Sequence, residues 1–164
     1  MITEEQYQDI KTRHVEHVKR YIKDMGSVFP HITVYSKRKS ENDDVIIHIP
    51  VPDDLMKSED LKERFVTDII PKLAEQLHKD FEPYGVAWTC EAWVRSSPQK
   101  DGFPDNWKQL PVDGEILMVS IEFENKNEMI IYDIKRTGKQ VTEDGDIVDH
   151  VDLIERDMSG ADGW

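Results

Sequence analysis

The sequence lacks the residues from which small proteins build covalent or metal-bound cross-links. Cys90 is the single cysteine among 164 residues. One thiol cannot form an internal disulfide, and no second Cys or His lies at the spacing that a zinc site requires. A hydrophobic core must therefore hold the fold, and a chain of this length can bury such a core as a single domain.

Long apolar runs are also missing. No segment approaches the roughly 18 to 20 apolar residues that a membrane helix needs. The opening MITEEQYQDIK has neither the basic nor the apolar region of a signal peptide. We therefore expect a cytoplasmic protein that does not bind membranes.

Positive charge is scarce relative to negative charge. The chain has 21 Lys and Arg against 34 Asp and Glu, a formal net charge of -13, which disfavours direct binding to nucleic acid. A protein partner, from a host cell or a phage, is the expectation that remains. Acids are densest after residue 136, and the last residues show no apolar periodicity. We predict a single domain over residues 1–156 and a flexible acidic tail over residues 157–164.

The N-terminal segment has the signals of an amphipathic helix. Thr3 and Gln6 stand at capping-box spacing, in which each side chain satisfies the other residue's backbone amide. Apolar residues then recur at three- and four-residue steps from Tyr7 to Met25, and Gly26 supplies a stop. One face of this helix is expected to enter the core.

A second helix is predicted to begin at Ser58, which can act as its cap. Its apolar positions trace one face; they are Leu61, Phe65, Val66, Ile69, Leu73 and Leu77. Pro71 lies inside this pattern and removes a backbone hydrogen bond. We therefore predict a kink there.

The strand signals come in pairs. Two β-branched runs, 31–36 and 45–51, flank a charged stretch, and the runs 115–123 and 129–136 flank the polar turn ENKNE. A single strand follows Gly85, and an EDG turn near the end is compatible with one more hairpin. The order predicts an α+β fold, a two-layer sandwich with a mainly antiparallel sheet of about five strands and two helices on one face.

The strand GVAWTCEAWVR separates its side chains onto two faces. Cys90 shares one face with Trp88 and other apolar residues, so we predict that it is buried and unreactive. The other face carries Glu91, Trp93 and Arg95 and is expected to lie on the side that the helices leave open. These three residues are either a surface ion pair with a tryptophan as cover or part of a binding site.

The segment CEAWVR, preceded by GVAWT, resembles the EAW motif of a group of small uncharacterised phage and bacterial proteins. In that group a helix ending in Gly, a strand with Pro, a second strand and a helix precede the motif, and a polar loop and two strands follow it. The corresponding segments here lie within residues 18–136 and include YIKDMG, VIIHIPV, EILMVSIEF and MIIYDIKR. The resemblance implies the same order of elements and an early protein of the kind that T4-like phages encode. It carries no assigned activity.

Motifs for catalysis, metal binding or cofactor binding are not found. HIT at 31–33 matches one element of the two-histidine phosphoesterases, but the only candidate second copy, HIP at 48–50, lacks the hydroxyl. His14 and His17 stand at helical spacing without a third ligand, and His14 is more typical of a core histidine. We assign no catalytic residue, no metal ligand and no cofactor.

The long connection 96–114 is the remaining unusual feature. Structureless loops of this length are uncommon in compact domains and are often functional. It carries Phe103 and Trp107 among prolines and glycines, so these rings either fold back as a lid or serve as anchors for a partner. Both alternatives stay open at the level of sequence.

Three functions compete on these grounds. The first is a non-enzymatic protein-binding module, in the form of a phage factor that inhibits or redirects a host protein. Its binding residues are Glu91, Trp93, Arg95, Phe103 and Trp107. The second is an acidic DNA mimic directed at a DNA-binding enzyme, and the third is an enzyme in which Glu91, Arg95 and His48 converge. The sequence leaves the oligomeric state open.

Overall fold

The computed structural model describes residues 2–100, 102 and 104–157. Residues 158–164, most of the predicted tail, lie outside the described residues, as does Phe103. None of the described helices is long and apolar enough to cross a membrane.

The fold is α+β, as predicted, and its sheet is antiparallel throughout. The helical elements are α1 (Glu4–Met25), α2 (Asp53–Met56), α3 (Glu59–Arg64), the π-helix η1 (Phe65–Ile69), α4 (Ile70–Asp80) and the 3-10 helix η2 (Trp107–Gln109). The strands are β1 (His31–Arg38), β2 (Asp44–Pro50), β3 (Phe81–Val94), β4 (Gly114–Phe123), β5 (Lys126–Val141) and β6 (Ile147–Glu155). They form one sheet in the order β2-β1-β3-β4-β5-β6. The sixth strand completes the hairpin that the EDG turn indicated.

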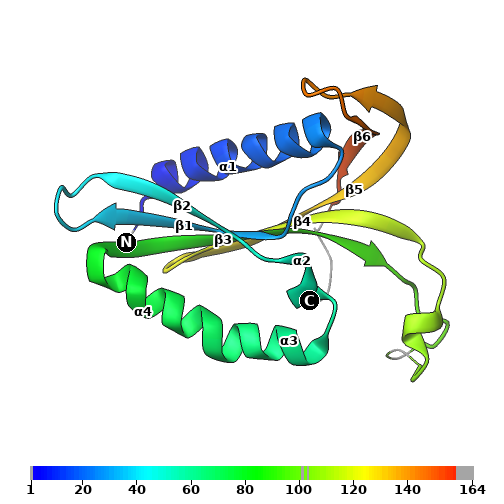
Figure 1. Cartoon of the computed structure of the whole chain (residues 1–164), viewed down its shortest axis with the longest axis horizontal. Coiled ribbons are helices and arrows are strands. Elements are labelled where there is room, and N and C mark those ends of the chain that lie inside the picture. The colour runs from blue at the N-terminus through cyan, green and yellow to red at the C-terminus, as the bar shows by residue number, and fades with distance from the viewer. Residues whose placement is uncertain (1, 101, 103, 158–164) are drawn as a thin grey trace.

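Helix α1 packs on one face of this sheet and forms the principal core (Figure 1). The capping box of Thr3 and Gln6 is present, and Gly26 ends the helix in the left-handed conformation, with φ at 79°. The buried side of α1 meets alternate residues of β4 and β5. These core residues include Val18, Ile22, Leu117, Val119, Ile121, Phe123, Ile130, Tyr132 and Ile134.

The segment from α3 to α4 lies on the opposite face of the sheet (Figure 1). The helices therefore cover both faces, whereas the sequence analysis placed them on one. The defect expected at Pro71 takes the form of the π-helix η1, in which the Ile70 N–H bonds to the Phe65 carbonyl. Phe65 is buried, but Val66 and Ile69 on the same helical segment are exposed. This second helical layer contributes much less to the core than α1 does.

Candidate functional site

The sequence analysis assigned the Glu91 face of β3 to the open side of the sheet, and the structure places that face on the side of α1. Glu91 pairs with Leu117, a fully buried core residue under α1, so Glu91 and Trp93 share the face that α1 covers. The prediction that helices leave this face open is therefore wrong. Cys90 points to the opposite face and is buried, as predicted. Burial raises the pKa of its thiol, although the Trp88 indole N–H donates to the sulfur at 3.2 Å.

Glu91 has a structural role at the end of α1. Its Oε1 accepts the backbone N–H of Val28 at 3.0 Å, and its Oε2 lies 3.7 Å from the Arg136 guanidinium. Burial raises the pKa of Glu91, and the Val28 hydrogen bond and the charge of Arg136 oppose that rise. The carboxylate thus fixes the segment that follows Gly26 against the sheet.

Arg136 is the centre of a charged cluster beside this contact. It donates to Glu115 Oε2 at 2.7 Å, to the Gly26 carbonyl at 2.6 Å and to Asp149 Oδ2 at 3.4 Å. The carbonyl belongs to the C-terminal end of α1, where a cation is favourable. With Glu91, this Arg136 cluster ties the helix end to β3, β4 and β6.

Trp93 lies beyond the reach of α1. Val28 already follows the end of the helix, and Trp93 is two positions further along β3 than Glu91, the residue that contacts Val28. No helix therefore covers the indole, which is 65% exposed. The Arg95 guanidinium lies 5.9 Å from the centre of its ring. Tryptophan and arginine are both among the residue types enriched at binding hot spots.

The long loop, residues 96–114, returns to the end of β3 beside Arg95. The Asp113 N–H bonds to the Val94 carbonyl at 2.7 Å, and Arg95 Nε donates to the Leu110 carbonyl at 3.0 Å. Trp107 stands one 3-10 turn before Leu110, so its backbone is within roughly 10 Å of this contact. Its side chain is 44% exposed with the Lys108 ammonium 5.4 Å from its ring centre, and it does not belong to the core. Trp107 is therefore not a lid on the principal core.

Two apolar residues join this region that the sequence analysis did not select. Phe29 is exposed and follows Val28, whose N–H bonds to Glu91, and Val112 is exposed at the base of the loop. Their position depends on the hydrogen bond between Val28 and Glu91 and on the closure of the loop, for which the sequence gives no local signal. We define the aromatic surface as Phe29, Trp93, Arg95, Trp107 and Val112.

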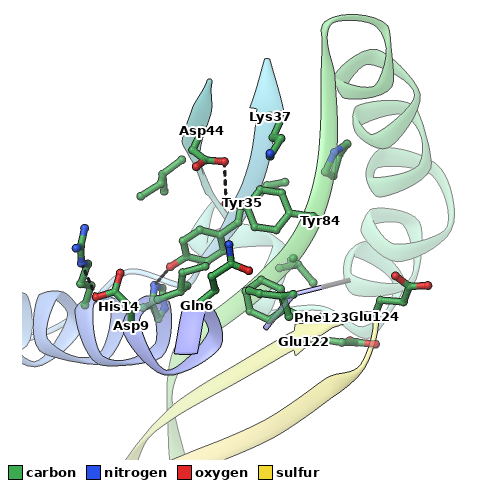
Figure 2. A pocket seen from close by; sticks show the side chains of 18 of the residues that line it. Gln6, Asp9, His14, Tyr35, Lys37, Asp44, Tyr84, Glu122, Phe123 and Glu124 are labelled. Atoms are coloured by element: carbon green, nitrogen blue, oxygen red, sulfur yellow. Dashed lines mark hydrogen bonds and ion pairs between the residues drawn. The ribbon is translucent and has the colours of Figure 1, made fainter. Parts of the chain in front are cut away.

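A second region is the groove between α1 and the strands β2, β1 and β3, with a volume of about 1200 Å³. Its floor contains the stacked rings of Tyr35 and Phe123, 6.0 Å apart, and Tyr84 beside them. Figure 2 shows Tyr35 reaching from β1 towards His14 on α1. Carboxylates outnumber cations around the opening; they are Asp9, Asp44, Glu82, Glu122 and Glu124, against Arg13 and Lys37.

His14 closes the inner wall of this groove and is a core histidine, as predicted. It is 4% exposed, its Nδ1 is 2.9 Å from the Tyr35 hydroxyl and its Nε2 is 3.3 Å from the Thr89 hydroxyl. Burial lowers the pKa of His14 to about 4. Because both nitrogens have partners, His14 cannot share a metal with His17. Within the part of the chain that the structure describes, no group of three or more His, Cys, Asp or Glu has the arrangement of a metal site.

His17 and His48 line one end of the groove, and His31 lies beside His48. The ring of His48 is 6.0 Å from that of His17 and 6.1 Å from that of His31, and its Nδ1 lies 3.0 Å from the Thr33 hydroxyl. The two histidines of the HIT and HIP segments do come together, but no second hydroxyl completes a phosphate-binding pair. Burial and the neighbouring imidazoles lower the pKa of His48.

The three candidate catalytic residues do not converge. His48 pairs with Thr33 in β1, and Thr33 pairs with Ala87 in β3. Glu91 therefore lies two strands away from His48 and roughly 13 Å further along β3. Arg95 lies beyond Glu91 and bonds to the loop. The structure gives this constellation no common cavity.

No protein-family model matches the chain, and neither does any curated protein or solved structure in the comparisons. The function is therefore argued from the two regions described above.

Proposed function

We propose that this chain is a non-enzymatic protein-binding module that docks a partner on the aromatic surface. The observation that supports the proposal most is the exposure of Trp93, 65%, at the end of β3, an inner strand of the sheet. Large indole rings of this kind provide most of the energy at protein interfaces when a partner buries them. The hydrogen bonds of the loop base hold Trp107 in the same region.

The chemistry of the surface indicates the kind of partner. Arg95 and Lys108 each place a cation over an exposed indole. A partner that buries both rings must also accept these cations, because an unpaired buried charge is costly. We therefore propose a protein with an apolar pocket rimmed by carboxylates. These two cations lie over the indoles of a chain whose formal net charge is -13.

The biological setting is proposed from the resemblance of the CEAWVR segment. A phage protein without catalytic residues acts by occupying or redirecting another protein, so the proposed partner is a host or phage protein in the cytoplasm. Glu91 has no direct part in this docking, since its carboxylate is engaged by Val28 and Arg136.

The test is affinity capture from a bacterial lysate with four forms of the chain. They are the wild type, Trp93→Ala, Trp107→Ala and the control Val141→Ala, which truncates an exposed apolar residue at the far end of β5. The proposal expects a protein that the wild type and the control retain and that both tryptophan variants lose. Equal recovery by all four forms would remove the aromatic surface as the docking site.

The acidic DNA mimic remains the second candidate, and the same experiment separates it. The acids of β6 that the structure describes are partly engaged: Asp149 pairs with Arg136 and Lys139, and Asp152 pairs with His150. Mimicry requires carboxylates directed at the partner. Capture of a DNA-binding enzyme that survives both tryptophan substitutions and is displaced by duplex DNA would favour mimicry over the aromatic surface.

A further inference from the structure

Strand β2 forms one edge of the sheet. Within the described residues it pairs with β1 alone, over the continuous register from Lys37 and Asp44 to His31 and Pro50. The other edge strand, β6, carries Asp149, His150, Asp152 and Glu155. In β2, five residues in succession, Val45 to Ile49, include four that are β-branched. The two edges therefore differ in how well they resist pairing with another chain.

Two hydrogen bonds at the ends of the β1–β2 pair determine which residues face outward. The Val51 N–H bonds to the Pro30 carbonyl at 2.8 Å, and the Arg38 N–H bonds to the Asp43 carbonyl at 2.9 Å. Bonded pairs alternate along an antiparallel ladder, so every second residue between these two contacts is bonded to β1. By this alternation Val45, Ile47 and Ile49 bond to β1. The residues that direct their N–H and C=O groups away from the sheet are Asp44, Ile46 and His48, and the Pro50 carbonyl.

The outward residues lack the features that normally protect a sheet edge. Proteins place lysines, bulges or prolines along exposed edges to prevent pairing. The β1–β2 register shows no bulge, and Pro50 stands only at the end of the strand. Ile46, at the middle of the edge, is 59% exposed. This edge is therefore available to another strand.

We propose that a second copy of this chain pairs with β2 in antiparallel orientation about a two-fold axis at Ile46. Residues facing each other across this axis have numbers that sum to 92, so Ile46 faces Ile46 and Asp44 faces His48 of the second copy. Each facing pair exchanges both backbone hydrogen bonds, because all of these residues direct N–H and C=O outward. The resulting sheet continues through both molecules.

The register follows from the side chains. With the axis at Ile46, a carboxylate faces an imidazole on each side, and β-branched residues face each other between them. An axis at Asp44 or His48 would set two like groups opposite each other. An axis at Ile47 would set Asp44 opposite Pro50, which has no N–H to donate. The Ile46 axis alone among these satisfies the backbone hydrogen bonds and sets each carboxylate opposite an imidazole that can donate to it.

The surroundings of His48 suit this contact. The Thr33 hydroxyl forms a hydrogen bond with His48 Nδ1. His48 Nε2 is therefore the nitrogen that can donate to the Asp44 carboxylate of the second copy. His17 on α1 and His31 on β1 are the other titratable groups beside the ring. Asp44 lies next to Lys37 in the register and accepts a long bond of 3.4 Å from the Tyr84 hydroxyl. The carboxylate thus keeps capacity for a further donor.

The test of the register is disulfide formation at single introduced cysteines in the full chain. In the proposed dimer the two Cα atoms at position 46 are about 5.5 Å apart, within the range for a disulfide. Ile46→Cys should therefore form a covalent dimer under mild oxidation. The matched control Pro50→Cys keeps Asp44, Ile46 and His48, and its two thiols are roughly 26 Å apart, so it should stay uncrosslinked. Buried Cys90 makes the wild type the background control.

The oligomeric state gives an independent readout. Sedimentation velocity should show a dimer for the wild type and for Trp93→Ala, and a monomer for Ile46→Lys, with unchanged circular dichroism as the check on folding. A wild type that stays monomeric to about 100 µM, or equal cross-linking at positions 46 and 50, would overturn the proposal. Because Trp93 lies outside this edge, failure here leaves the docking proposal for the aromatic surface standing.

Discussion

Two of the polar clusters that hold α1 to the sheet do so by different physical means. The cluster around His14, in the middle of the helix, is enclosed and consists of an imidazole and two hydroxyl groups. The cluster around Arg136, at the helix end, consists of charged groups, and the arginine side chain is 25% exposed. The enclosed cluster is neutral because a buried charge without a partner is costly. The open one can use charges because water and several carboxylates stabilise them.

The comparison matters for function because the charged cluster lies beside the aromatic surface. Glu91 and Glu115, both partners of Arg136, flank Trp93 as its neighbour along β3 and its partner in β4. In the cluster around His14, by contrast, the imidazole and the hydroxyl groups of Tyr35 and Thr89 form hydrogen bonds with each other. The two clusters should therefore respond differently to pH, to salt and to loss of a single partner.

The largest effect is expected from the pH dependence of stability through His14. Its pKa falls from the ordinary value of 6.5 to about 4 on folding, so below pH 6.5 the unfolded state binds the proton and the folded state does not. Stability is therefore complete above the unfolded pKa and falls as the pH drops towards 4, by up to about 3 kcal/mol. Urea denaturation from pH 7.5 to 4.5 measures the slope.

Asp and Glu carboxylates titrate in part of the same pH range. The contribution of His14 is therefore measured as the difference in the pH slope of stability between the wild type and His14→Gln. His14→Gln should be less stable at pH 7.5 and should lose part of the slope, whereas the exposed-site control His78→Gln should retain the whole of it. Identical slopes in all three proteins would show that His14 is not the group that resists protonation.

A smaller loss is expected when the charged cluster loses its cation. Arg136→Met leaves Glu91, Glu115 and Asp149 close together without compensation, at a cost of about 2 kcal/mol after allowance for solvent exposure. The difference from wild type should shrink in 1 M NaCl, because salt screens partly exposed charges. Arg136→Lys keeps the positive charge but not the several directed hydrogen bonds. Its stability should therefore fall between that of the wild type and that of Arg136→Met. A salt-independent loss would indicate packing rather than charge.

A similar or smaller loss is expected from one hydroxyl of the enclosed cluster. Tyr35→Phe keeps the ring stacked on Phe123 and removes the partner of His14 Nδ1. A buried polar atom left without a partner costs about 1 to 2 kcal/mol. Unlike the loss at Arg136, this one should be independent of salt. Denaturation at low and high NaCl on both variants compares the clusters directly.

Local signals in the sequence predicted much of the fold. The capping box at Thr3, the stop at Gly26 and the pairs of β-branched runs each depend on neighbouring residues alone, and each is present in the structure. The burial of Cys90 was also correct. These features need no knowledge of distant contacts.

The assignment of faces failed for a physical reason. β3 is an inner strand covered on both sides, so Cys90 and Thr89, neighbours on opposite faces, are both buried. Alternation separates the two faces of such a strand but does not tell which one meets the larger helix. The more apolar set, with Trp88, faces the α3–α4 side, and the set with Glu91 faces α1.

The candidate site was predictable in part. Trp93, Arg95 and Trp107 were selected from the sequence, and the structure brings them into one region. Phe29 was not selected, because its segment is linked to β3 by the long-range hydrogen bond between Val28 and Glu91. Glu91 was selected as a binding residue, but its long-range contact with Arg136, 45 positions later, gives it a structural role.

The most direct test of the docking proposal compares binding and stability in the same variants. Purified Trp93→Ala and Trp107→Ala should each bind the captured partner about 30-fold more weakly than the wild type, the change expected from loss of an aromatic anchor worth about 2 kcal/mol. Their denaturation midpoints should stay within about 0.5 kcal/mol of wild type in stability, as for exposed residues. Folded variants that bind the partner with wild-type affinity would contradict the proposal that the aromatic surface is the docking site.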